Sequence, residues 1–184
     1  MLGNPGSGLT RLGLLLLAPP AREGPVVYLD VRGWLCPLAA WECGIAPERL
    51  VVVRCLDRRR WPQVAAAIFE GVRAVYAEIP AGVEGAALRR LAALARARRT
   101  SVVLRPLGGE LPSGVAYLQV RAEAVSWGGP EAGHHRLQQR RLMLQLSGKG
   151  AGGLEQIVEV EDDGADLVRV VPRMVPTTAG RAAG

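Results

Sequence analysis

The chain has few of the residue types that most often mark a function. Among its 23 basic residues only Lys149 is a lysine, and its aromatic residues are four Trp, three Tyr and one Phe. Three cysteines, Cys36, Cys43 and Cys55, show no C-x-x-C spacing. We interpret them as reduced thiols that pack as small apolar groups, and a secreted disulfide framework is not expected.

Long apolar runs are also absent. No run approaches the roughly 18–20 residues of a transmembrane helix, so we expect no membrane partner. The run Leu12–Ala18 follows a glycine-rich rather than a basic lead. Its length is at the lower end for a signal peptide, so we favour a cytoplasmic protein. His134 and His135 are adjacent, so a helix or strand would not place both on one face, and we expect no metal site.

The remaining composition is typical of a globular protein with an excess of arginine. Hydrophobic residues make up 49% and charged residues 22% of the 184 positions, which suits one domain with a sizeable core. The net charge of +6 favours polyanionic partners only weakly. Because lysine is scarce throughout, its absence from any one motif need not reflect function alone.

A glycine-rich loop near the start is the most informative motif. The segment Gly3–Thr10 fits the phosphate-loop pattern of glycine, four residues, glycine, lysine, then Ser or Thr, except that Leu9 replaces the lysine. In such loops backbone N–H groups surround a phosphate at a helix N-terminus, and the hydroxyl reaches magnesium. The candidate nucleotide-binding residues here are Gly3, Gly6, Ser7, Gly8 and Thr10. A glycine-rich loop without a ligand is the alternative.

Strand and helix signals alternate after this loop. Helices are expected at 10–18 (ended by Pro19 and Pro20), 37–43, 61–70 and 84–99, and strands at 25–30, 49–55, 73–79 and 100–105. This order predicts an α/β domain with a mostly parallel central sheet and helices on both faces. Strands at 115–125, 141–146, 156–161 and 167–171 are then expected as antiparallel additions to that sheet. We expect the domain to span 1–171, with a flexible tail at 172–184.

The order of these elements resembles the core of the RecA-type recombinases, from Gly3 to about Val171. Four segments carry the resemblance in the right order: 28–32 with its strand-ending Asp30, 43–50, 74–79 and 101–106. The resemblance implies a RecA-like phosphate-loop fold. It also implies that Glu78 stands where a recombinase has its magnesium-associated aspartate.

Several positions depart from the recombinase pattern. Leu9 replaces the phosphate-binding lysine, Arg32 stands in place of the glutamate that activates water, and Pro106 falls where a sensing glutamine belongs. Losing one such group typically lowers the rate by orders of magnitude. We therefore expect a pseudo-ATPase that needs neither ATP nor magnesium as a cofactor. We also expect shortened DNA-contacting loops, at 80–85 and 107–114, and no filament-forming N-terminal arm. Either the strand before the glycine loop is missing or reduced to Met1-Leu2, or the true start lies upstream.

A RecA-like core with these losses is similar to the ImuA family, also called SulA-like or RecA-like mutasome proteins. The resemblance implies an accessory role in damage-induced translesion DNA repair through protein contacts. The implied partners are a Y-family polymerase-like protein and an error-prone polymerase, with a recombinase and DNA as further candidates. Two alternatives stay open: a weak or nucleotide-regulated ATPase with Arg11 as the surrogate charge, and a cell-division regulator that reuses the fold.

Acidic, basic and aromatic residues complete the candidate sites. Asp30 and Glu78 end strands where open α/β sheets bind ligands, but without the lysine we favour idle acids over a magnesium site. Trp34 falls in an expected loop and would be a protein-binding anchor if exposed, although core packing is the default for the tryptophans. The candidate residues for contact with DNA or an acidic partner are Arg54, Arg58, Arg59, Arg60, Arg89, Arg96 and Arg99.

Overall fold

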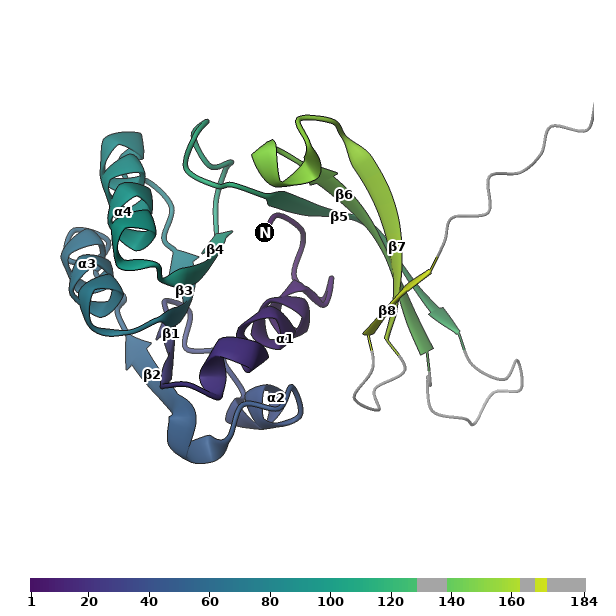
Figure 1. Cartoon of the computed structure of the whole chain (residues 1–184), viewed down its shortest axis with the longest axis horizontal. Helices are drawn as coiled ribbons and strands as arrows, with labels where there is room; N and C mark the ends of the chain where they lie inside the picture. The colour runs from purple at the N-terminus through teal and green to yellow at the C-terminus, as the bar shows by residue number, and fades with distance from the viewer. Residues whose placement is uncertain (129–138, 163–167, 172–184) are drawn as a thin grey trace, which may run out of the picture.

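A computed structural model describes residues 1–128, 139–162 and 168–171 of the chain. The expected tail and the histidine pair lie outside these residues. The described part contains two sheets, with the helix that follows the glycine loop between them (Figure 1). No helix of this part is long and apolar enough to cross a membrane.

The first sheet is parallel, with strand order β2-β1-β3-β4. Its strands are β1 (Val26–Asp30), β2 (Leu50–Arg54), β3 (Ala74–Ile79) and β4 (Ser101–Pro106). The central strands β1 and β3 are buried along their whole length, which explains their continuous apolar sequences. The mixed α/β character and the parallel sheet with flanking helices are thus confirmed.

Helices cover both faces of this sheet. On one face lie α1 (Leu9–Ala21) and the short α2 (Pro37–Trp41), and on the other α3 (Trp61–Gly71) and α4 (Gly85–Arg98) (Figure 1). Side chains of β1 and β3 alternate between the two cores, with Tyr28 and Tyr76 facing α1, and Leu29 and Val75 facing the α3 and α4 side. A 3₁₀ turn, Pro47–Arg49, leads into β2.

The second sheet is antiparallel, in the order β5-β6-β7-β8. Its strands are β5 (Gln119–Gly128), β6 (Gln139–Ser147), β7 (Gln156–Asp162) and β8 (Val168–Val171), and a second 3₁₀ turn spans Lys149–Ala151. The expectation that these strands extend the parallel sheet was wrong. They form a sheet of their own because their apolar side chains, including Val120 and Leu142, pack against the outer side of α1.

Two element boundaries also differ from expectation. Helix α1 continues through Pro19 and Pro20 instead of ending before them. Both prolines lie in the last turn, where their carbonyls still accept hydrogen bonds from Arg22 and Glu23, and burial of Ala21 holds this turn in place. Strand β5 begins at Gln119 rather than near Val115, because Val115 packs in the core beside α3 and α4.

Gly13, in the middle of α1, lies close against the side chains of the parallel sheet. A Cβ at this position would overlap Cε2 of Tyr76 and lie 3.1 Å from Cγ1 of Val103. Glycine is a poor helix former, so it is not favoured here by helix propensity. It is explained by the lack of space for a larger side chain beside Tyr76.

We therefore expect Gly13→Ala to lower the free energy of unfolding by about 1–3 kcal/mol, because overpacking outweighs the gain in helix propensity. Gly71→Ala is the matched control, since a Cβ at the end of α3 would meet nothing within 4 Å. Urea unfolding should show the control unchanged or more stable. Equal effects of the two substitutions would contradict this account of Gly13.

Candidate functional site

The glycine loop lies over the carboxyl ends of the parallel strands. Gly6 and Gly8 adopt positive φ angles of 81° and 74°, so both positions favour glycine. Gly8 is the N-cap of α1 and accepts the N–H of Leu12 at 3.0 Å. The guanidinium of Arg140 lies where a side chain at position 8 would begin. The loop thus keeps the backbone shape expected from its glycines.

A cleft of about 270 Å³ opens beside this loop. The α1 N-terminus brings its positive dipole end to it. Residues 5–10 form one wall, and the other lining residues are Tyr28, Arg32, Trp34, Leu35, Cys36, Ala39 and Arg105. Of the predicted nucleotide-binding residues, Gly6, Ser7, Gly8 and Thr10 border the cleft, and Gly3 does not.

Leu9 is part of the wall of the cleft, but its side chain packs into an apolar core. Its side chain is 1% exposed and packs with Val120, Leu142, Leu144 and Val160 of the antiparallel sheet. An ammonium group there would be buried among apolar side chains at a cost of several kcal/mol. The residue that breaks the phosphate-loop pattern is therefore a core residue that packs the start of α1 against the antiparallel sheet.

Glu78 is the most heavily hydrogen-bonded acid of the site. Its carboxylate accepts the backbone N–H groups of Val31 at 3.0 Å and Arg32 at 3.2 Å, and the hydroxyl of Tyr28 at 3.2 Å. The Arg32 guanidinium donates through Nε at 3.0 Å and through Nη2. These donors fill the carboxylate, which is 1% exposed, so it is closed to a ligand from the cleft.

The ionisation of this cluster follows from its contacts. Burial raises the pKa of Glu78, but the hydrogen bonds and charge of Arg32 and the N–H of Val31 more than offset it, so the pKa lies below its ordinary value. Bonding to Glu78 raises the pKa of Arg32. Burial, with the nearby Glu78, raises the pKa of Tyr28, and burial raises that of Tyr76 to about 12. The pair is an ion pair and the tyrosines are neutral near pH 7.

Asp30 lies beside Glu78 at the end of the neighbouring strand, as expected. Its Oδ1 accepts the N–H of Gly33 at 2.7 Å, and Oδ2 has no hydrogen bond within the described residues. Like Glu78, it does not line the cleft. In residues 1–128, 139–162 and 168–171, no three His, Cys, Asp or Glu side chains gather as metal ligands would.

Sequence reasoning missed Arg105, which is 5% exposed at the carboxyl end of β4. Its Nη2 donates to the carbonyl of Gly3 at 3.1 Å, whereas Nε and Nη1 find no acceptor within the described residues. A charged residue that ends an otherwise apolar strand, level with Glu78, was the available signal. Arg11, the expected surrogate charge, instead binds Asp162 at 3.1 Å, outside the cleft.

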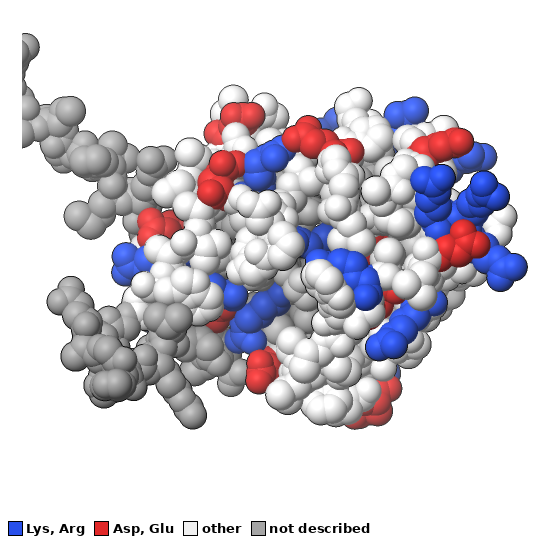
Figure 2. Space-filling view, turned by 180° about the vertical axis from the view of Figure 1, so that it is seen from behind, with Lys and Arg blue, Asp and Glu red and all other residues white. Residues whose placement is uncertain are grey.

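The predicted basic residues do not share one groove. Arg58 and Arg59 line a groove of about 720 Å³ between α3 and α4, whereas Arg96 and Arg99 line another along β4. Arg54, Arg60 and Arg89 line neither. In Figure 2, basic side chains gather at the end of the molecule that carries α3 and α4, with acidic side chains among them.

Three of the four tryptophans are exposed, so the default expectation of core packing was wrong for them. Trp61 is buried, but Trp34 is 69% exposed, and Trp41 and Trp127 are also exposed. The Arg32 guanidinium lies 4.8 Å from the Trp34 ring centroid, a cation–π contact that orients the ring. Leu38 and Trp41, which follow Trp34 closely in the sequence and lie three residues apart on α2, are also exposed.

Residues 6–112 match the family described as the MT3502 N-terminal domain. The chain belongs to this family. The matched segment begins inside the glycine loop and extends past β4, so the MT3502 N-terminal domain comprises α1, the parallel sheet and the cleft. Strands β5–β8 lie beyond it. No curated protein matches the chain.

The Arg32–Glu78 pair makes a pH-dependent contribution to the stability of the MT3502 N-terminal domain. Because the pKa of Glu78 is lowered on folding, this contribution is present above the ordinary glutamate pKa and is lost as the pH falls through the lowered value. We expect Arg32→Met to lower the free energy of unfolding by about 3 kcal/mol at pH 7, because it leaves a buried charge unpaired.

This deficit should shrink as the pH falls toward 4, since Glu78 without Arg32 takes up a proton more readily. The double variant Arg32→Met/Glu78→Gln is the control, and it should be more stable than Arg32→Met at pH 7. Urea unfolding across this range measures both effects. A deficit that stays constant with pH would show that Arg32 acts through packing alone.

Proposed function

We propose that this chain is a non-catalytic RecA-like accessory protein of the ImuA type, which acts through protein contacts in damage-induced translesion DNA repair. The observation that carries this proposal is the state of the two positions central to ATP hydrolysis. Leu9 is buried in the core between α1 and the antiparallel sheet, and Arg32 is ion-paired to Glu78. Both positions serve the structure of the protein, which leaves its surfaces to carry the function.

The exposed apolar side chains support a role in protein contacts. Trp34, Leu38 and Trp41, which we term the tryptophan face, are 69%, 52% and 44% exposed. Tryptophan is among the residues most often found as hot spots of protein interfaces. The proposed partners are a Y-family polymerase-like protein and an error-prone polymerase, with a recombinase and DNA as further candidates. The proposal places the protein in the cytoplasm, without ATP or magnesium as a cofactor.

A nucleotide-regulated protein is the second candidate function, favoured by one observation. Arg105 is buried with Nε and Nη1 unpartnered in the described part of the chain, and it borders the cleft at the N-terminus of α1. A phosphate group would supply the missing acceptors. The two candidates differ in whether nucleotide binds at all, and calorimetry with ATP and magnesium separates them.

Restoring the loop lysine tests the loss of catalysis. We expect the wild-type chain to show no ATP turnover, and Leu9→Lys to show none either. The substitution should lower the free energy of unfolding by more than about 3 kcal/mol, since it buries a charge in an apolar core. Leu9→Met is the control and should cost less than about 1.5 kcal/mol.

Calorimetry, a phosphate-release assay and urea unfolding together report these outcomes. Micromolar ATP binding by the wild-type chain, with turnover abolished by Thr10→Ala, would refute the non-catalytic proposal. Binding without turnover would favour the nucleotide-regulated candidate instead.

The tryptophan face should be required for partner binding. We expect the tagged full-length chain to co-purify a Y-family polymerase-like protein from DNA-damaged cells, and Trp34→Ala/Trp41→Ala to reduce this recovery at least about tenfold. Trp127→Ala, which removes an exposed tryptophan from the antiparallel sheet, is the matched control and should leave recovery unchanged. Quantitative mass spectrometry measures the amounts.

Recovery of a cell-division protein with no polymerase homologue would replace the repair role by the division-regulator alternative. If the Trp34→Ala/Trp41→Ala and Trp127→Ala variants lose recovery of the polymerase-like protein equally, the tryptophan face is not the specific contact surface.

A further inference from the structure

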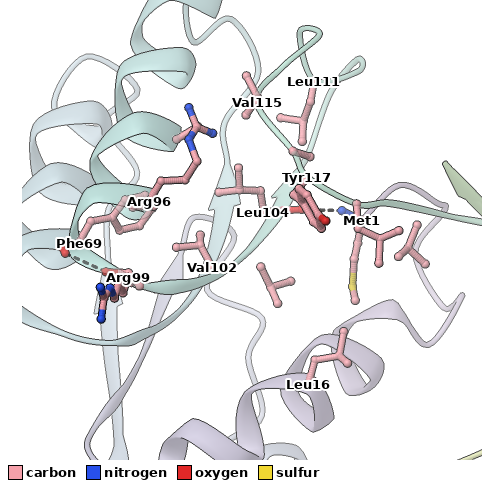
Figure 3. Close-up of a pocket in the computed structure, with 17 residues that line it drawn as sticks. Met1, Leu16, Phe69, Arg96, Arg99, Val102, Leu104, Leu111, Val115 and Tyr117 are labelled. Carbon is pink, nitrogen blue, oxygen red and sulfur yellow. Dashed lines mark hydrogen bonds between the residues drawn. The ribbon is translucent and has the colours of Figure 1, made fainter. Parts of the chain in front are cut away.

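An apolar groove of about 400 Å³ runs along β4, away from the cleft beside the glycine loop. We term it the β4 groove (Figure 3). Val102, Val103 and Leu104 of β4 form its floor, and Leu16 of α1 and Tyr117 lie on its sides. Ala92 and Ala95 add small side chains from α4, which leave room above the strand.

The floor of the groove is the open edge of the parallel sheet. Strand β4 is the last in the order β2-β1-β3-β4 and pairs only with β3 in the described part of the chain. The Met1 nitrogen donates to the carbonyl of Leu104 at 2.7 Å on this edge. Because strand geometry repeats every two residues, the backbone N–H and C=O of Val102 face the same edge. They have no strand partner among the described residues.

The side chains around this edge are apolar at the flanks and basic at one end. Leu16 is 55% and Tyr117 72% exposed, and Leu118 is also exposed. Arg96 and Arg99, near the start of β4, bring two positive charges to the groove, and none of the described residues that line it is acidic. The groove therefore combines an open strand edge, apolar walls and a positive end.

We infer that the β4 groove binds an extended apolar segment of another protein, which adds to the sheet as a strand beside β4 and carries an acidic side chain to Arg96 and Arg99. Backbone hydrogen bonds to the Val102 edge would give affinity, and the apolar walls and the two arginines would give specificity. About four residues at a rise of roughly 3.3 Å each would span the edge between Ser101 and Leu104.

Two other occupants fit the groove less well. An apolar small molecule would contact the walls of the groove but leave the strand edge without hydrogen-bond partners. The edge strand β2 of a second copy ends in Arg54 and is followed by Arg58, Arg59 and Arg60, so like charges would meet at Arg96 and Arg99. Charge complementarity therefore favours an acidic partner over self-association.

This inference deepens the proposed function only in that both assign the chain to protein contacts. It concerns a different surface from the tryptophan face, so the two stand or fall separately. If the wild-type chain binds no peptide in the groove but still recovers the polymerase homologue, the inference is refuted and the proposed function stands. If the groove binds peptide but no polymerase homologue is recovered, the proposed function is refuted and the inference stands.

The test begins with a phage library of random linear peptides, selected on the immobilised full-length chain. Selected sequences should combine a short apolar stretch with Asp or Glu at one end. Binding of fluorescein-labelled selected peptides is then measured by anisotropy. We expect Val102→Pro to weaken binding at least about tenfold, because proline removes the edge N–H, whereas an edge strand tolerates proline in the fold.

Val52→Pro is the matched control, since it places the same residue on β2, the opposite edge of the sheet. A second pair of variants keeps the test valid if Val102→Pro fails to fold. Arg96→Glu should weaken binding at least about tenfold, whereas Arg89→Glu, on the same helix but outside the groove, should not. Circular dichroism and thermal unfolding confirm that each variant is folded.

Several outcomes would overturn the inference. One is selection of peptides without acidic residues, or peptide binding that is equal for Arg96→Glu and Arg89→Glu. Another is a dimer of the chain, seen by sedimentation, that Val102→Pro dissociates, which would assign the groove to a second copy. The selection can also be run with the Val102→Pro chain as a competing target. If no peptide then prefers the wild-type chain, the inference is refuted.

Discussion

The double burial of α1 is the constraint on which the rest of the structure depends. One side of this helix packs through Leu14 and Leu17 against the parallel sheet, and another packs through Leu9 against the antiparallel sheet. A helix that is apolar on most sides must be covered on most sides. The second sheet therefore stays close to the start of the chain, and so does the glycine loop that enters α1.

This constraint explains why the loop fits the glycine pattern of a phosphate loop but has a leucine in place of the lysine. Gly8 leaves space for the Arg140 guanidinium, so glycine is needed there for packing even if no phosphate binds. Leucine at position 9 is favoured by the same packing, because that side chain fills the core between α1 and the antiparallel sheet. Arg32 plays the corresponding role at the strand ends, where it neutralises Glu78. The glycine at position 8 and the leucine at position 9 thus have one structural cause, the packing around α1.

The elements of the fold could be predicted from the sequence more fully than the site. Continuous apolar runs such as Val26–Leu29 and the proline and glycine signals around α3 identify strands and helices locally. The separate second sheet could not be predicted, because its position depends on which side of α1 Val120 and Leu142 cover. The pairing of Arg32 with Glu78 and the burial of Arg105 depend on strand order, which one sequence does not reveal. The sequence does identify Asp30 and Glu78 as acids at the strand ends, because both lie near the ends of apolar strands.

The ion cluster at Asp162 has a consequence for where this protein can be divided. Arg11 of α1 and Arg140 of β6 both bind this one carboxylate of β7, and all three are largely buried. The segment shared with the MT3502 N-terminal domain family ends at residue 112, before two of the three partners. A chain cut at residue 112 would therefore leave the Arg11 guanidinium without its Asp162 partner, so strands beyond the matched segment contribute to the stability of α1.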